Sequence, residues 1–420
     1  MLRRLANTPL SLSLGSWTRR HASCRRALSS QAPALTWQDV EEPLDAYKER
    51  GYMPISIGDR LGEYRVLRKL GWGGYSTVWL VQRERDMCLA AAKVMTESST
   101  RDPRLHELEF LQCMRSQQPL HAGYSHVTKL IDHFHHPPSS QKHLCLITEP
   151  LSENLLSFSA RWKKRRLPVP LVKHITRQVL LGLDYLHNIC DIIHTDLKTD
   201  NIMFAMSDEE ILASAVDKGE RLKSVDNLPD GTQVTRYRSS PIRFRLPEGH
   251  LDSYNTWSHV TAKIGDVGVS CWANQVGNYS VDLIQSSALR APEVCVGAGW
   301  GKPADIWSMG CIVFELLTGN SLIEPNAKDL SIPNLHMVMF GDYPLQLVQR
   351  GQYSEYFFNE DGSPKMRFKE RFLLEEIIEG AGLPERPLLT DFLLKMFALD
   401  PAKRATCHEL LEHEWLEPTD

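Results

Sequence analysis

The sequence has 420 residues, of which 42% are hydrophobic and 24% are charged, so the chain can bury a sizeable core as one large domain or as two lobes. Its net charge of -4 is too small to indicate a particular partner. No apolar run approaches the roughly 18 residues that a membrane span needs, so we expect a soluble protein.

The charge is unevenly distributed along the chain. Residues 1–38 contain six arginines and no acidic residue, which leaves 42 basic against 52 acidic residues, a net charge of -10, in the rest. An acidic body favours cationic substrates, although salt screens the attraction. Residues 1–36, rich in Arg and Ser, resemble a mitochondrial transit peptide, and the alternatives are a disordered basic extension or a misplaced start codon. We leave them outside the predicted fold.

The nine cysteines are scattered, with no C-x-x-C pair and no histidine at zinc-ligand spacing. This pattern predicts small buried thiols in a reducing compartment rather than disulfides or a metal site.

The first half of the chain predicts strands of an antiparallel sheet. Alternating apolar residues begin at Tyr64, and three later runs have the same character: residues 77–81, 88–94 and 144–148. The sequence Gly-Trp-Gly-Gly-Tyr-Ser at residues 71–76 predicts a glycine-rich turn between the first two strands.

Helices are predicted between and after these strands. Residues 104–116 predict a helix because Glu107, Leu111 and Met114 share one helical face. After a polar crossover at residues 149–154, strongly apolar helical faces recur in three segments: 171–188, 305–317 and 388–398.

Strands followed by helices, with a short crossover between them, predict an α+β protein with two lobes and a cleft at their junction. We assign residues 37–63 to an N-terminal extension, 64–150 to a small antiparallel-sheet lobe and 151–417 to a larger helical lobe. From about residue 207 to 259 the sequence is polar and too long for an ordinary connection. We expect a partly disordered surface insertion there.

The most specific motif is His194-Thr195-Asp196-Leu197-Lys198-Thr199-Asp200-Asn201, between a predicted helix and a short strand at 202–204. An aspartate, a lysine two residues later and an asparagine five residues later match the catalytic loop H-x-D-L-K-x-x-N of protein kinases. So many fixed positions rarely match by chance.

Further motifs follow in a fixed order. Asp266-Val267-Gly268 comes after a strand predicted at 263–265, and Ala291-Pro292-Glu293 begins 25 residues later. Asp305-Ile306-Trp307-Ser308 and then Arg404 complete the series. Each motif is common alone, but their order is the one that a protein kinase requires.

Two signals upstream are weaker. Gly71-x-Gly73 alone is ordinary turn chemistry, and its third glycine position holds Ser76. Because phosphate would be bound by backbone N–H groups, serine also fits there. Lys93 ends a strand 22 residues after Gly71, and Glu107 on the next helix is its expected partner. Most such lysines simply extend from a strand edge into solvent.

Together these motifs resemble eukaryotic protein kinases over roughly residues 60–417, and the finer text is similar to the SR-protein-specific kinases. Several segments carry that similarity: Gly58-Asp59-Arg60, Arg68-Lys69-Leu70-Gly71-Trp72-Gly73, Ser76-Thr77-Val78-Trp79-Leu80, Arg177-Gln178-Val179-Leu180, Pro303-Ala304-Asp305-Ile306-Trp307-Ser308 and Gly351-Gln352-Tyr353-Ser354. In that family a spacer interrupts the kinase domain where the insertion lies here, although this one is short.

The resemblance implies an ATP- and Mg²⁺-dependent serine/threonine kinase that phosphorylates Arg/Ser-rich proteins of mRNA splicing. Asp196 would accept the proton of the attacking hydroxyl, and Lys198 would meet the γ-phosphate. Asn201 and Asp266 would hold Mg²⁺, which prefers oxygen ligands. The implied nucleotide-binding residues are Leu70, Gly71, Gly73, Ser76, Val78, Ala91, Lys93, Glu107, Glu149 and Leu151. Thr148 would lie beside the adenine pocket.

Two departures from the family pattern affect regulation and specificity. Thr195 replaces the usual arginine of H-R-D, so a phosphorylated activation loop would lose a principal cationic partner, and we expect activity without that phosphorylation. The segment Ser286-Ser287-Ala288-Leu289 and Ala291-Pro292 differ from the family's usual peptide-binding segment, which leaves the substrate open. Arg290 matches an arginine of the wider group containing cyclin-dependent kinases.

The remaining expectations also come from the resemblance. We expect a monomer that binds protein substrates but neither nucleic acid nor membrane, in the cytoplasm and nucleus, or in mitochondria if the leader is a transit peptide. One alternative is a pseudokinase scaffold, although Lys93, Asp196 and Asp266 are all present. A kinase of another branch is a second alternative, and a small-molecule kinase is a third.

Overall fold

The structure, a computed structural model, describes residues 41–137, 142–216, 223–228, 231–276, 282–366 and 370–418. The predicted leader lies outside these ranges. The chain divides into two units, Met1–Pro43 and Leu44–Asp420, and the fold below belongs to the second. Within the described ranges, no helix combines the length and apolar character that crossing a membrane would require.

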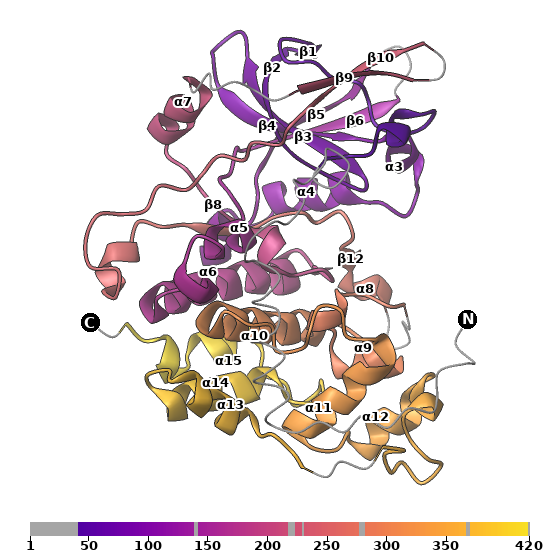
Figure 1. Cartoon of the computed structure of the whole chain (residues 1–420), viewed down its shortest axis with the longest axis vertical. Coiled ribbons are helices and arrows are strands. Elements are labelled where there is room, and N and C mark those ends of the chain that lie inside the picture. Colours follow the sequence, from indigo (N-terminus) through magenta and orange to yellow (C-terminus); the bar gives the residue numbers. More distant parts are fainter. Residues whose placement is uncertain are drawn as a thin grey trace, which may run out of the picture. The chain divides into compact units, whose positions relative to one another are not determined.

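The small lobe is built on one antiparallel sheet with the strand order β1-β2-β3-β4-β6-β5 (Figure 1). Its strands are β1 Arg60–Leu61, β2 Tyr64–Gly73, β3 Ser76–Arg83, β4 Leu89–Met95, β5 Leu130–His136 and β6 His143–Thr148. Every strand predicted for this lobe is present, and β1 and β5 are additions. A small core that includes Trp79, Val81 and Ile147 covers one face of the sheet.

Two helices connect β4 to β5. The first, α3 Glu97–Arg101, was not predicted, and Thr96 caps it by accepting a hydrogen bond from the Ser99 backbone. The second, α4 Glu107–Ser116, begins three residues later than predicted. Residues before it form a tight turn instead, in which Asp102 accepts hydrogen bonds from the backbone and side chain of Arg104. Phe110, Leu111 and Met114 of α4 face the core.

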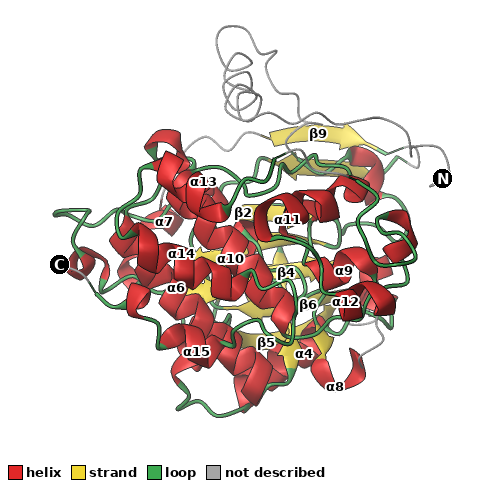
Figure 2. Cartoon of the chain, turned by 90° about the horizontal axis from the view of Figure 1, so that it is seen from below, coloured by secondary structure: helices red, strands yellow, loops and turns green. Residues whose placement is uncertain are grey.

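The large lobe is helical, and in Figure 2 its helices lie in front of the strands. Its helices are α5 Leu155–Ser159, α6 Val169–Asp184, α8 Ala273–Val276, α9 Pro292–Val296, α10 Pro303–Thr318, α11 Ile332–Phe340, α12 Leu345–Arg350, α13 Leu374–Ala381, α14 Arg386–Met396 and α15 Cys407–Leu411. Helix α6 ends earlier than predicted because Tyr185–Ile189 forms a π-helical turn. Helices α6 and α10 are buried along most of their length and form the centre of the main core.

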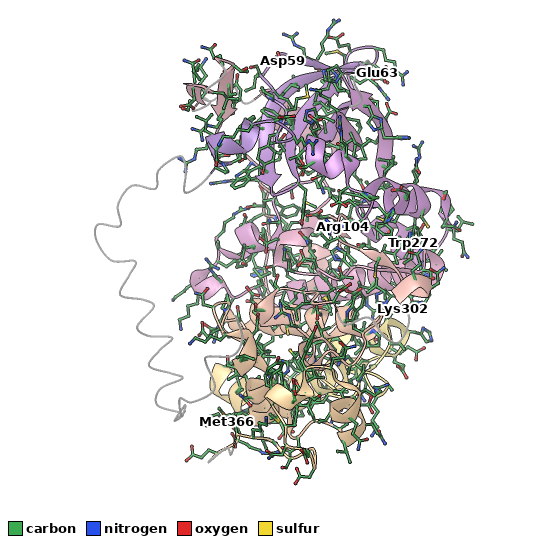
Figure 3. All side chains as sticks on the ribbon, turned by 90° about the vertical axis from the view of Figure 1, so that its right-hand side faces the viewer. Asp59, Glu63, Arg104, Trp272, Lys302 and Met366 are labelled. Carbon is green, nitrogen blue, oxygen red and sulfur yellow. The ribbon has the colours of Figure 1, made fainter. Side chains whose placement is uncertain are left out.

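Two small antiparallel pairs hold the loops between the lobes. β7 Ile192–Ile193 pairs with β12 Cys271–Trp272, and β8 Ile202–Phe204 pairs with β11 Ala262–Ile264. Trp272 lies at the junction of the lobes (Figure 3), where its ring packs 4.8 Å from that of Phe110 in α4. The catalytic-loop motif therefore lies between β7 and β8.

The insertion contains regular elements that were not predicted. It contains α7 Asp208–Val216 and a hairpin of β9 Lys223–Asn227 with β10 Gln233–Tyr237. The hairpin lies beside the sheet of the small lobe (Figure 1). The ring of Tyr237 meets that of Trp79 edge-on, with 6.0 Å between the ring centres. Trp257 and Val234 are fully buried. The polar average composition of the segment did not indicate these two buried side chains.

Candidate active site

Lys93 lies on β4 between Val78 of β3 and Leu146 of β6, so its side chain projects from the middle of the sheet. Its Nζ is 2.6 Å from Oε1 of Glu107 on α4, which is the predicted contact. The same Nζ is 2.8 Å from Oδ1 of Asp266. One lysine therefore connects the sheet, the helix and the Asp-Val-Gly motif.

The charges of Lys93 and Asp266 stabilise each other. Burial disfavours the Lys93 ammonium, but Glu107 and Asp266 together outweigh it and raise the pKa of Lys93. The neighbouring Lys93 lowers the pKa of Asp266 to about 2, against the effect of burial. The Asp266 side chain is still 54% exposed, so its ionised carboxylate is open to solvent.

The Asp-Val-Gly motif has two local constraints, one at Asp266 and one at Gly268. Asp266 has φ 53°, in the left-handed region that side chains rarely adopt, as is common at functional sites. A Cβ at Gly268 would lie 3.0 Å from Oε2 of Glu107. Glycine is therefore favoured at position 268, because any side chain there would be in tight contact with the Glu107 carboxylate.

The catalytic-loop side chains form a second cluster. Lys198 Nζ donates to Oδ2 of Asp196 at 2.6 Å, and Asn201 Nδ2 donates to the Asp196 carbonyl at 2.9 Å. Asn201 ends the short 3-10 turn Thr199–Asn201, which directs its amide back toward Asp196. The aspartate, lysine and asparagine of the motif are thus in contact.

Buried Asp305 of α10 holds this loop in place. Its Oδ2 accepts hydrogen bonds from the His194 backbone at 2.8 Å and from His187 Nε2 at 2.9 Å. Its Oδ1 accepts one from the Thr195 backbone at 2.9 Å. Burial opposes ionisation, but these bonds lower the pKa of Asp305. Sequence reasoning noted Asp305 only as part of an ordered motif and missed this positioning role.

The two clusters belong to one site. The Gly265 N–H donates to the Asn201 carbonyl at 2.8 Å, and the Gly265 carbonyl oxygen lies 3.0 Å from His194 Nε2. Asp266, which follows Gly265, contacts Lys93, while Asn201 contacts Asp196. The β8–β11 pair therefore brings the predicted catalytic and metal-holding residues to the same edge.

The glycine-rich turn closes β2 against β3, with Gly73 paired to Ser76. A Cβ added at Gly71, Gly73 or Gly74 would meet no atom within 4 Å. Packing inside the protein therefore does not require these glycines, and the space beside the backbone is open to a ligand. Ser76 is buried in β3, so its side chain packs inside the small lobe and does not replace a glycine of the turn.

The other predicted nucleotide-binding residues are at the sheet and the crossover. Leu70, Val78 and Ala91 lie on β2, β3 and β4, and buried Leu151 follows β6. Glu149 behaves differently from a free acidic side chain. Its Oε1 accepts hydrogen bonds from Lys263 Nζ at 2.8 Å and from the Lys129 backbone at 3.0 Å. The Glu149 carboxylate is therefore already bonded within the protein.

The segment after Asp266 returns to the catalytic loop. Thr195 Oγ1 donates to the Val269 carbonyl at 2.8 Å, and the Gln285 N–H donates to the Thr195 carbonyl at 3.1 Å. Ser286 Oγ lies 3.4 Å from Asp196 Oδ1. Arg290 is paired with Asp329, with Nη1 2.7 Å from Oδ1. Thr195 thus connects both ends of this segment.

Comparison with known proteins agrees with this geometry. The protein kinase domain family matches residues 64–226 and 253–416, so the match passes over part of the insertion. A solved crystal structure of a kinase domain superposes with a TM-score of 0.64 at 23% identity, covering 87% of this chain and 99% of that chain, which supports the fold.

Three curated proteins narrow the family. The serine/threonine-protein kinase SRPK of Physarum polycephalum is 32% identical, covering 90% of this chain and 91% of its own length. Protein kinase dsk1 of Schizosaccharomyces pombe is 31% identical over 90% of this chain and 85% of its own. SRSF protein kinase 3 of Mus musculus is 29% identical over 91% of each chain. The chain therefore belongs to the protein kinase family, among the serine/threonine kinases of the SR-protein kinase type.

Proposed function

We propose that this kinase transfers the γ-phosphoryl group of Mg²⁺-bound ATP to serine hydroxyls in Arg/Ser-rich proteins. The observation that carries the proposal is the double contact of Lys93, whose Nζ lies within 2.8 Å of carboxylate oxygens of both Glu107 and Asp266. This contact joins the sheet, α4 and the Asp-Val-Gly motif into one arrangement that can hold a phosphate chain.

The residues present fit ATP and Mg²⁺. The glycine-rich turn leaves open space where phosphates could approach backbone N–H groups. Asp266 and Asn201 supply oxygen atoms, the ligand type that Mg²⁺ prefers. When bound, the metal would neutralise charge on the transferring group. Donor type and open space, rather than any single distance, support this assignment.

Each side chain then has a definite task. Asp196 orients the substrate hydroxyl and accepts its proton, and Lys198, held on Asp196, offers positive charge to the transferring group. Lys93, kept ionised by its two carboxylates, fixes the phosphates. Because the transition state is loose and highly charged, positioning and charge neutralisation are the main contributions of the protein.

The substrate class rests on two supports. Outside the arginine-rich leader the chain has a net charge of -10, which attracts cationic peptides through a salt-screened field. One relative is named SRSF protein kinase 3. We also propose that the protein is located in the cytoplasm and nucleus. The alternative is a mitochondrial location, which import of a tagged chain into isolated mitochondria would test.

A peptide array with radiolabelled ATP tests the activity and the substrate class together. We expect Arg-Ser repeats to be labelled more strongly than Pro-directed or acidic peptides, and less strongly as salt is raised. The Asp196→Asn variant should bind nucleotide but transfer at a rate lower by about 10²-fold or more. Preference for another peptide class would overturn the substrate proposal, and equal labelling by the variant would overturn the role of Asp196.

A further inference from the structure

A tyrosine outside the predicted site bonds directly to the glycine-rich turn. The Tyr52 hydroxyl donates to the Gly73 carbonyl at 2.8 Å. Gly73 is the last residue of β2 and pairs with Ser76 across the turn. The turn has no side chain at Gly73 or Gly74 through which packing could restrain it, so a bond to its backbone restricts it directly.

The backbone before Tyr52 is fastened to the start of α3. The carbonyls of Arg50 and Gly51 accept hydrogen bonds from the first N–H groups of α3, at 2.9 Å from Ser98 and 3.1 Å from Glu97. A Cβ at Gly51 would lie 1.9 Å from the Ala46 carbonyl oxygen, so no larger residue fits there. Tyr52 therefore extends from a fixed point of the small lobe.

The insertion hairpin supports the Tyr52 ring from the other side. Tyr52 is only 6% exposed, and it packs in a small cluster with Tyr47, Leu228 and Val234. The Tyr47 and Tyr52 rings are 5.6 Å apart. Leu228 and Val234 belong to the β9–β10 hairpin and its connection, so the insertion supplies two of the buried side chains in the cluster that contains Tyr52.

The hairpin itself is held on the sheet. Lys69 Nζ on β2 donates to the Tyr237 carbonyl at 3.2 Å, and the Ser240 N–H donates to the Lys69 carbonyl at 3.0 Å. These bonds fix the hairpin to β2, the strand that ends in the glycine-rich turn, and the Trp79 contact of Tyr237 adds a contact with β3. Movement of the hairpin would therefore be transmitted to Tyr52.

We propose that Tyr52 is a positioning residue for nucleotide binding, and that the β9–β10 hairpin acts on the glycine-rich turn through it. The proposal rests on the function proposed above, because it assumes that ATP phosphates lie against this turn. A turn already held in one conformation loses less entropy when it closes on a nucleotide. The insertion thus contributes to ATP affinity from outside the site.

The Tyr52→Phe variant tests the hydroxyl while keeping the ring. We expect KM for ATP, and the dissociation constant for Mg²⁺-ADP measured calorimetrically, to rise by about threefold to tenfold. KM for the peptide and the melting temperature should be unchanged. Tyr64→Phe is the matched control, because Tyr64 donates a phenol hydrogen bond to Asp132 on the same lobe away from the turn. Unchanged nucleotide affinity in Tyr52→Phe overturns the inference.

A pair of hairpin variants tests the connection. Val234 is fully buried and Val225 is 52% exposed on the same hairpin. We expect Val234→Ala to raise KM for ATP, Val225→Ala to leave it unchanged, and the Val234→Ala, Tyr52→Phe double variant to match Tyr52→Phe alone. Additive effects would overturn the role of the hairpin. If the wild-type chain binds no nucleotide, the proposed function fails as well. If the wild-type chain binds nucleotide and Tyr52→Phe binds it equally well, only this inference fails.

Discussion

Arg404 and Glu293 form a two-pronged ion pair in the interior of the large lobe, although 111 residues separate them in the chain. Nη1 lies 2.7 Å from Oε1 and Nη2 lies 2.9 Å from Oε2, and both side chains are completely buried. The guanidinium also donates to the Ala398 and Pro303 carbonyls and lies 5.2 Å from the Trp307 ring centre. One arginine thus joins α9, the start of α10 and the end of α14.

Replacing Arg404 with alanine should destabilise the large lobe strongly. The change leaves the Glu293 carboxylate buried without a partner, which typically costs about 3–5 kcal/mol of unfolding free energy. Urea denaturation would measure it. Arg386→Ala is the control, because its pair with Glu379 is exposed and contributes at most about 1 kcal/mol. Similar small losses for both variants would show that the buried pair contributes little.

Lys93→Met should abolish most activity without unfolding the protein. The substitution removes the one ammonium that lies between the Glu107 and Asp266 carboxylates, and the rate of phosphoryl transfer should fall by about 10²-fold or more. Initial rates at saturating peptide and a melting curve would check this. Lys395→Met, which changes an exposed lysine on α14, should behave like the wild type. A variant that kept full activity would contradict the phosphate-holding role.

Activity should survive phosphatase treatment. Thr195 bonds directly to Val269 and Gln285, so both ends of the segment 269–285, which follows the Asp-Val-Gly motif, are held without a phosphate group. We expect treated and mock-treated enzyme to have equal rates. Thr195→Val, which keeps the shape but removes the hydroxyl, should lower the rate by up to about tenfold. Loss of activity after phosphatase treatment would show that a phosphate is needed after all.

Stability should fall in acid partly because of His336. Burial lowers the pKa of His336 to about 3, and its Nδ1 lies 2.8 Å from the Tyr343 hydroxyl. An unfolded histidine titrates near 6.5, so below that pH the unfolded chain binds a proton that the folded chain does not. This group therefore destabilises the fold by about 1.4 kcal/mol per pH unit as the pH falls toward 3.

His336→Phe should reduce that acid slope by one proton, as measured by urea denaturation between pH 7 and about 5. Phenylalanine keeps a ring against Trp307, whose centre lies 4.7 Å from that of His336. His126, His136, His143 and His174, whose pKa values burial also lowers, would contribute to the remaining slope. An unchanged slope in His336→Phe would assign the acid sensitivity to other groups.

Local patterns predicted the parts of the fold that are regular in sequence. Alternation identified the strands around the glycine-rich turn, and helical spacing identified α6 and α10 because their buried faces are continuous. The Lys93–Glu107 pair was predictable since both residues lie on elements with clear periodicity. β5 was missed because His133, His135 and His136 interrupt its apolar pattern.

Other features depend on contacts that no local pattern encodes. The role of Asp305 arises from hydrogen bonds to residues more than 100 positions away. The hairpin β9–β10 lies in a polar segment, and few of its side chains are buried, so the average composition indicated disorder. The available signal was in the sequence alone, where Pro229-Asp230-Gly231 between two alternating runs is a pattern that predicts a turn.

The position of the hairpin makes the small lobe discontinuous in sequence. Its sheet comes from Arg60–Thr148, but Trp79 is covered by Tyr237, which the chain supplies only after it has already passed through the catalytic loop. A chimera that exchanged the small lobe as a single uninterrupted piece would expose that indole. It would also remove Leu228 and Val234 from the cluster around Tyr52. Grafting this lobe onto another kinase therefore requires both segments to be transferred together.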